Sequence, residues 1–222
     1  MNRVESFARA LDAGVTAAVR QASSIKTNSR LDALRQSFSD PEVARSAASD
    51  IKDYVLENFD ELLAQFEANA KKNGIRVHQA GTPEEARSII VSLCQAANGP
   101  IVKGKSMATE EIHLNSALIE AGHEVVETDL GEFVVQLDGD TPSHIVTPII
   151  HRTRRDVART FLKAEIGSGT EDPAELAMQA RKFLRQKFKG AAVGISGVNF
   201  AIAETGRLVI IENEGNNRLS TT

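Results

Sequence analysis

The stretch at residues 100–128 reads PIVKGKSMATEEIHLNSALIEAGHEVVET, and it decides the fold class. Residues 100–103 and 123–128 are short apolar runs that predict strands. The segment between them places Ile112, Leu118 and other apolar residues at helical spacing, so one helix to Gly122 is expected. A strand, a helix and a second strand in this order predict a βαβ unit and a mostly parallel sheet. We therefore expect an α/β fold.

The pattern continues on both sides of this stretch. Further elements are predicted as follows: one helix over 51–73, a strand over 75–78, a helix over 82–98 capped by Thr82, helices that begin at Thr153 and at Asp172, a short apolar run at 192–195, and a hairpin over 199–212 with Gly206 in its turn. Residues 1–50 have thin apolar content and predict an N-terminal helical extension, with the α/β domain over 51–222. The polar end, ENEGNNRLSTT, shows no closing helix or strand, so we expect the natural chain to continue.

Composition excludes several classes of protein. The 222 residues carry a formal net charge of −4, which does not predict a nucleic-acid surface. The single cysteine, Cys94, falls on a helical apolar pattern and predicts a buried thiol. No stretch approaches the roughly 20 apolar residues of a membrane span, and the first residues lack the apolar core of a signal peptide. A cytoplasmic protein is expected.

A basic loop and an acidic turn are the first candidate site. Lys103, Lys105 and Ser106 follow a predicted strand and open a helix, a position that suits an anionic ligand. Glu127 and Asp129 follow the next strand, and close carboxylates suit acid–base chemistry or a divalent cation. The alternative is that Asp129 and Glu132 cap a turn. We predict that a lysine of the loop lines the same cavity as Glu127, Asp129 or His151.

Other candidates lie further along the chain. His144 and His151 are candidate proton donors or substrate anchors, but their spacing does not predict a metal site. Asn199 lies among apolar residues and is expected to be a buried, partnered amide. The remaining candidate binding residues belong to the hairpin turn and to the loop after it: Glu204, Thr205, Glu212, Asn213 and Glu214.

Five motifs in order resemble the lactate-utilisation (LUD) domain family, most closely its B-type subunit. They read KGKSMATEEI, VVETDLGEFVVQL, PSHIVTPIIH, GVNFAIAETG and IENEGNNRL. The resemblance runs from about Ile51 to the end of the sequence. One departure is Gly104, where the family commonly has serine.

The resemblance implies a three-layer α/β/α fold of the NagB/RpiA/CoA-transferase kind. It also implies a part in L-lactate oxidation to pyruvate, within a complex with other lactate-utilisation subunits. The domain would then bind a small carboxylate such as lactate or pyruvate, or dock partner subunits. The [4Fe-4S] clusters of the B-type subunit would belong to a C-terminal segment beyond Thr222. A different function, by analogy of fold, is CoA-transferase or sugar-phosphate-isomerase chemistry with Glu212 or Glu214.

Overall fold

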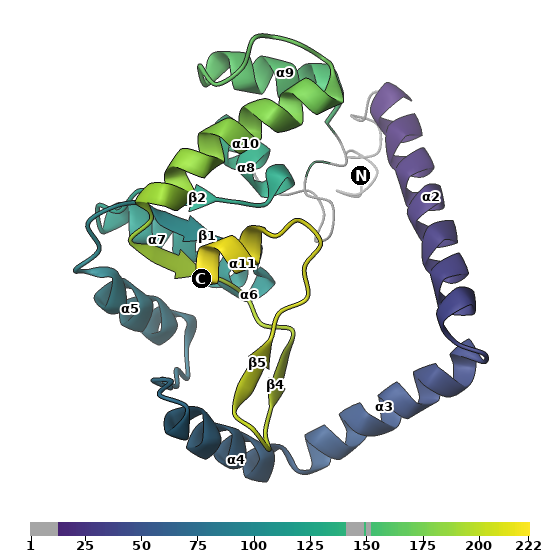
Figure 1. The fold of residues 1–222 in the computed structure, drawn as a ribbon, viewed down its shortest axis with the longest axis vertical. Helices are drawn as coiled ribbons and strands as arrows, with labels where there is room; N and C mark the ends of the chain where they lie inside the picture. Colours follow the sequence, from purple (N-terminus) through teal and green to yellow (C-terminus); the bar gives the residue numbers. More distant parts are fainter. Residues whose placement is uncertain (1–12, 141–148, 150–151) are drawn as a thin grey trace, which may run out of the picture.

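A parallel sheet forms the centre of the molecule. The computed structural model describes residues 13–140, 149 and 152–222 (Figure 1). Strands β1 (Ile101–Lys103), β2 (Val125–Glu127) and β3 (Val193–Ile195) form a sheet of order β2-β1-β3, and both pairings are parallel. The predicted α/β class with a mostly parallel sheet is therefore confirmed.

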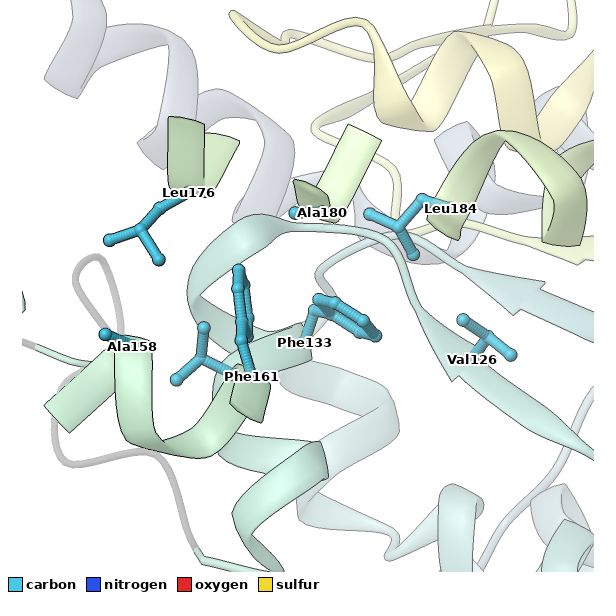
Figure 2. Packing of buried hydrophobic residues seen from close by; sticks show 8 residues of the cluster. Val126, Phe133, Ala158, Phe161, Leu176, Ala180 and Leu184 are labelled. Atoms are coloured by element: carbon cyan, nitrogen blue, oxygen red, sulfur yellow. The ribbon is translucent and has the colours of Figure 1, made fainter. Parts of the chain in front are cut away.

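Helices cover both faces of this sheet. Adjacent strand residues point to opposite faces, and Val126 and Val125 belong to two separate hydrophobic clusters. On one face Val126 packs with α8 (Leu130–Asp138), α9 (Arg154–Lys163) and α10 (Pro173–Gly190). Figure 2 shows these side chains converging around Phe133 and Phe161. On the other face, Val125 and Ile101 pack with α5 (Pro83–Cys94) and α7 (Leu114–Glu120).

Three predicted helix starts are correct. The Thr82 side chain accepts a hydrogen bond from the Glu85 backbone N–H at the start of α5. Thr153 forms a reciprocal capping box with Asp156 at α9, and Asp172 caps α10. These side chains satisfy backbone N–H groups that have no partner inside the helix.

The predicted single helix over 51–73 is wrong. Asn58 separates α3 (Pro41–Glu57) from α4 (Phe59–Lys72), and α2 (Ala13–Ser37) precedes them. Figure 1 shows α2 and α3 extending away from the sheet. Helix α3 has no buried residue, so the apolar face predicted from Ile51 onward is exposed along this helix. The predicted boundary between residues 50 and 51 lies inside α3 and remains a prediction.

Two other predicted elements need correction. Residues 75–78 alternate like a strand, but they pair with no strand of the described residues and form a loop. Alternation alone does not make a strand, because a strand needs a partner for its backbone groups. The helix expected up to Gly122 is two helices, α6 (Met107–Glu111) and α7, because His113 between them adopts a left-handed conformation with φ 51°.

Two helices were not predicted from the sequence. The residues interpreted as an acidic turn begin α8, and the polar C-terminal end forms α11 (Asn216–Thr221). Helix α11 packs against β3 and β1. Glycines make room for it: a Cβ at Gly194 would overlap the backbone carbonyl oxygen of Ser220, and one at Gly104 would overlap the Asn217 side chain.

The predicted hairpin is confirmed. Strands β4 (Phe200–Ile202) and β5 (Arg207–Val209) are antiparallel, and Gly206 has φ +65° in the turn. Figure 1 shows the hairpin tip beside α4, away from the parallel sheet. There the side-chain amide of Asn69 donates to the carbonyl oxygens of Ala203 and Glu204 at 2.9 and 3.1 Å.

Gly194→Ala tests the packing of α11. We expect the free energy of unfolding to fall by about 1–3 kcal/mol, because the new methyl group meets backbone rather than a movable side chain. Urea unfolding followed by circular dichroism measures it. Gly81→Ala is the matched control, since a Cβ there meets only the Glu85 carboxylate at 3.4 Å. Equal stabilities of the two variants would show that α11 does not pack as described.

Candidate functional site

A buried ion pair lies at the carboxyl ends of β1 and β2. Lys103 and Glu127 are the last residues of the two strands and are register partners. Lys103 Nζ lies 2.9 Å from Glu127 Oε1, and the two side chains are 1% and 5% exposed. The Asn115 side chain donates to the same carboxylate oxygen at 2.6 Å, and Lys103 Nζ also donates to Thr109 Oγ1 at 3.1 Å. The predicted meeting of the basic loop with the acidic turn therefore takes the form of an ion pair.

A second pair lies beside the first. Lys105 Nζ is 3.2 Å from Glu132 Oε1, and the Lys105 side chain is 22% exposed, more than that of Lys103, although the Lys105 Nζ atom itself is buried. Ser106 caps α6 by accepting from the Thr109 N–H at 3.4 Å. Both lysines predicted to hold an anion thus already have carboxylate partners. Glu132 was considered only as a turn residue, yet it is buried in this cluster.

Three carboxylate oxygens of the cluster are buried and have no hydrogen-bond partner among the described residues: Glu127 Oε2, Glu110 Oε1 and Glu132 Oε1. Of these, Glu132 Oε1 has the Lys105 ammonium beside it. Burial raises the pKa of Glu127, against the opposing effects of Lys103 and Asn115. Burial also raises the pKa of Glu110, and the nearby Glu132 carboxylate adds to this. A carboxylate with a raised pKa and an unused oxygen can accept a proton from a bound molecule.

Glu127→Gln should change how stability depends on pH. Because the Glu127 pKa is raised in the folded state, the folded protein binds more protons than the unfolded chain between the ordinary carboxyl pKa and the raised one. Glu127 therefore makes the free energy of unfolding fall as pH rises through that window. The Gln variant should show a shallower fall, measured by urea unfolding at a series of acidic pH values. The exposed Glu120→Gln variant is the control, and identical slopes for wild type and Glu127→Gln would contradict the assignment.

Asp129 and Glu214 meet at the start of α8. Asp129 Oδ1 accepts from the backbone N–H groups of Gly131 and Glu132 at 3.0 and 3.3 Å, so Asp129 caps this helix. The Glu214 carboxylate accepts from the Leu130 N–H. Burial and then the Asp129 charge raise the pKa of Glu214. The geometry therefore shows Asp129 in the structural role that was the alternative, as a cap. A catalytic role for Asp129 remains a prediction.

The other sequence candidates do not join this cluster. Asn199 is exposed rather than buried, and its Oδ1 accepts from the Ile211 N–H at 2.7 Å at the base of the hairpin. Glu204 and Thr205 contribute their backbone carbonyls, which bind the side chains of Asn69 and Asn73. The Glu212 carboxylate accepts from the backbone N–H groups of Asn217 and Arg218, so it caps α11. Asn213 is exposed in the same loop.

Both candidate histidines, His144 and His151, lie outside the described residues. Within the described ranges, no group of three or more histidine, cysteine or acidic side chains could hold a metal ion. No helix in that same part of the chain is long and apolar enough to cross a membrane.

A cavity that the sequence interpretation missed lies between α10 and the C-terminal segment. Its volume is about 700 Å³. It is lined by Thr128 and Leu130, just after β2, and by Glu214, Asn216 and Leu219 of the C-terminal segment. Helix α10 contributes three cations, Arg181, Arg185 and Lys189. Their spacing of four residues could have predicted this basic row from the sequence, because it puts them on one helix face.

Hydrogen bonds connect this cavity to the ion pair. The Asn216 side chain donates to Thr128 Oγ1 at 3.3 Å, and Thr128 Oγ1 donates to the Lys103 carbonyl oxygen at 2.9 Å. Lys103 itself does not line the cavity, and neither do Lys105 and Glu127. The structure thus places these three residues beside this cavity rather than in its wall, whereas the predicted binding residue Glu214 lines it.

Comparison with known proteins decides the family. The family model of the LUD domain matches residues 63–222. The chain belongs to the LUD domain family. The match begins inside α4 and includes the whole sheet, the Lys103–Glu127 pair and the hairpin. No solved structure matches the LUD chain.

Several curated relatives share much of this LUD sequence. Lactate utilization protein B of Bacillus subtilis (strain 168) is 49% identical over 180 residues, which are 80% of this chain and 38% of the relative. A protein of the same name from Exiguobacterium sp. is 45% identical over 95% of this chain and 45% of its own length. The uncharacterized electron transport protein YkgF of Escherichia coli (strain K12) is 42% identical over 87% and 42%. The LUD chain therefore spans about two fifths of the length of these relatives.

The residues of this chain do not fit an iron–sulfur cluster. A [4Fe-4S] cluster takes about four cysteine thiolates. The 222 residues contain one cysteine, and Cys94 is buried, with burial raising the pKa of its thiol. A raised thiol pKa disfavours the thiolate that ligates a metal. No step through a cluster is therefore assigned to these residues.

Proposed function

We propose that this LUD domain takes part in L-lactate oxidation to pyruvate, within an assembly with other lactate-utilisation subunits. Family membership and the names of the relatives support this proposal. We further propose that the domain binds a small carboxylate such as lactate or pyruvate. The proposal includes a cytoplasmic location, where a single free thiol stays reduced.

One observation carries the proposed chemistry: the buried Glu127 has an unused oxygen beside Lys103. Oxidation of a 2-hydroxy acid requires a base for the hydroxyl proton and an acceptor for the hydride equivalent at C2; the residues of this chain supply the base, and the acceptor belongs to the proposed assembly. Glu127 Oε2 is buried and has no hydrogen-bond partner among the described residues, and burial raises the Glu127 pKa. A raised pKa makes the Glu127 carboxylate a stronger base than an ordinary carboxylate.

The neighbouring residues would have separate roles. We assign the substrate carboxylate to Lys105, because its side chain is more exposed than that of Lys103 and its present partner, Glu132, is also an anion. Glu127 would accept the hydroxyl proton. Lys103 and Asn115 both bind Glu127 Oε1, which leaves Oε2 for that proton.

Lys105→Met tests the carboxylate site. Calorimetric titration of the intact protein with L-lactate and with pyruvate should show binding, and the variant should bind at least tenfold more weakly, since a charged hydrogen bond contributes about 1.5–3 kcal/mol. Lys163→Met on the exposed end of α9 is the matched control. The assignment fails if neither ligand binds at millimolar concentration, or if both variants bind like the wild type.

We also propose that the fold is the three-layer NagB/RpiA/CoA-transferase kind. A parallel sheet with helices on both faces supports it. Residues 1–50 would be an extension to this domain, and residues 51–222 the domain itself.

Acyl transfer on Glu214 is a second candidate function, and one observation favours it. Glu214 lines the cavity and has a raised pKa, whereas the Glu212 carboxylate is occupied as a helix cap. The ionised Glu214 carboxylate would attack the thioester carbonyl, form an acyl anhydride, and release the thiolate, which takes up a proton. Mass spectrometry of the intact protein after incubation with acetyl-CoA should detect the adduct in wild type and in Glu212→Gln but not in Glu214→Gln. Absence of an adduct in all three would remove this candidate.

A further inference from the structure

The cavity beside α10 has walls of two chemical kinds. Apolar side chains from three segments form one part: Leu130, Ala177, Ala180, Leu184, Phe188 and Leu219. Ala180 and Leu184 also belong to the core, and Figure 2 shows them on α10 above the Phe133 side chain. The volume of about 700 Å³ lies within the range of small-molecule sites. A mostly apolar pocket with a few convergent charged groups is typical of such sites.

The charged part is a row of three cations on α10, with one carboxylate, Glu214, on the C-terminal segment. Arg181, Arg185 and Lys189 follow one another at every fourth residue of α10, so the row extends about 12 Å along the helix. None of the three forms an ion pair within the described residues. Lys187 of the same helix shows the contrast: it does not line the cavity, and it pairs with Glu124 at 2.5 Å.

The length of the row decides the class of ligand. A single carboxylate as small as lactate can engage one of these cations and leaves the others unmatched. An anion with two or more phosphate charges can engage several at once, and arginine binds phosphate oxygens with two parallel hydrogen bonds. The apolar walls require that such an anion also carries an apolar or flat body.

We propose that the cavity between α10 and α11 binds an organic diphosphate of the nucleoside diphosphate class. The phosphates lie along Arg181 and Arg185, and the organic body packs against the apolar wall. Lys189 extends the positive row for a longer ligand. This site is separate from the Lys105 site and does not depend on lactate binding or on acyl transfer by Glu214.

The alternative is that the cations form a flat basic surface that binds an acidic protein. The geometry favours a small ligand instead. The cations line a hollow of about 700 Å³ that is also lined by apolar side chains of three segments, namely Leu130, α10 and Leu219. A side chain that fills the hollow without changing charge therefore separates the two cases. Ala177 is exposed, lines the cavity, and lies on α10 one turn before Arg181, so Ala177→Phe is that variant.

The test is calorimetric titration of the intact protein with ADP, inorganic phosphate and coenzyme A. ADP should bind, and phosphate should bind at least tenfold more weakly because it lacks the organic body. Coenzyme A contains the adenosine 5′-diphosphate group with an added 3′-phosphate and a pantetheine arm, so tighter binding than ADP identifies a cofactor of this class as the source, and equal binding identifies a nucleotide. Either ranking supports the site.

Variants then locate the binding. Arg181→Ala with Arg185→Ala should weaken ADP binding at least tenfold, while Arg154→Ala with Arg155→Ala, an exposed pair on α9, should not. Ala177→Phe should abolish binding, with circular dichroism showing that the variant is folded. The proposal is overturned if ADP does not bind at millimolar concentration. It is also overturned if Ala177→Phe binds ADP like the wild type, because the cations would then act only as a surface.

Discussion

Lys103→Met is expected to lower the free energy of unfolding by roughly 3–5 kcal/mol at neutral pH. The substitution removes the cation from a pair whose side chains are 1% and 5% exposed, and it leaves the Glu127 carboxylate buried without its counter-ion. Asn115 remains as a hydrogen-bond donor but carries no charge. Urea unfolding followed by circular dichroism measures the loss.

A double variant distinguishes the loss of the ion pair from the cost of leaving one charge buried and unpaired. Lys103→Met combined with Glu127→Leu should recover most of the lost stability, because apolar residues of similar size avoid the desolvation of both charges. Lys163→Met, an exposed lysine, should stay within about 0.5 kcal/mol of wild type. If Lys103→Met behaves like Lys163→Met, the lysine is not buried against Glu127.

Phe133→Ala should cost a similar amount, about 3–5 kcal/mol. Phe133 is 1% exposed and holds α8 against the sheet. Its ring centroid lies 6.2 Å from that of Phe161 and 5.4 Å from that of Phe183, so truncation removes contacts with α9 and α10 together. The same urea unfolding measurement reports the change.

Phe200 supplies the matched control for this variant. It lies on the hairpin and is 60% exposed, so Phe200→Ala should change the free energy of unfolding by about 0.5 kcal/mol or less. A small effect of Phe133→Ala would mean that α8 does not close the core, and the site at its start would lose its support.

Local signals in the sequence predicted the parts of the fold that depend on neighbouring residues. The caps Thr82, Thr153 and Asp172 and the turn at Gly206 needed only a few residues of context. Helix α8 was also readable. Helical spacing is present between the cap Asp129 and Gly139, at Leu130, Phe133, Val134 and Leu137. The cluster of carboxylates was nevertheless interpreted as a turn.

Tertiary contacts decided the elements that the sequence interpretation got wrong. Residues 75–78 alternate as a strand does, yet they pair with no strand in the part of the chain that the structure describes. Helix α11 is only six residues long and is stabilised by its packing on β3, which Gly194 permits. No residue pattern within ENEGNNRLSTT predicts that packing.

In the candidate site too, local sequence signals predicted some features and tertiary contacts decided the others. The position of Lys103 and Glu127 at strand ends followed from the βαβ pattern, and their direct pairing needed the register of β1 and β2. The sequence interpretation placed Glu212 and Glu214 together as candidates, whereas the structure gives one to the α11 cap and the other to the cavity. Which face of α10 meets the cavity depends on helix packing, so Arg181 and Arg185 could be recognised only as a basic row.

The most direct measurement of the central claim is a crystal structure of the intact protein with L-lactate or pyruvate bound. The proposed function predicts ligand density at the carboxyl ends of β1 and β2, with a carboxylate oxygen about 3 Å from Lys105 Nζ and the substituent at C2 facing Glu127 Oε2. Density only along Arg181 and Arg185, or no ordered ligand at millimolar concentrations of either compound, would contradict the claim that the strand-end cluster binds the substrate.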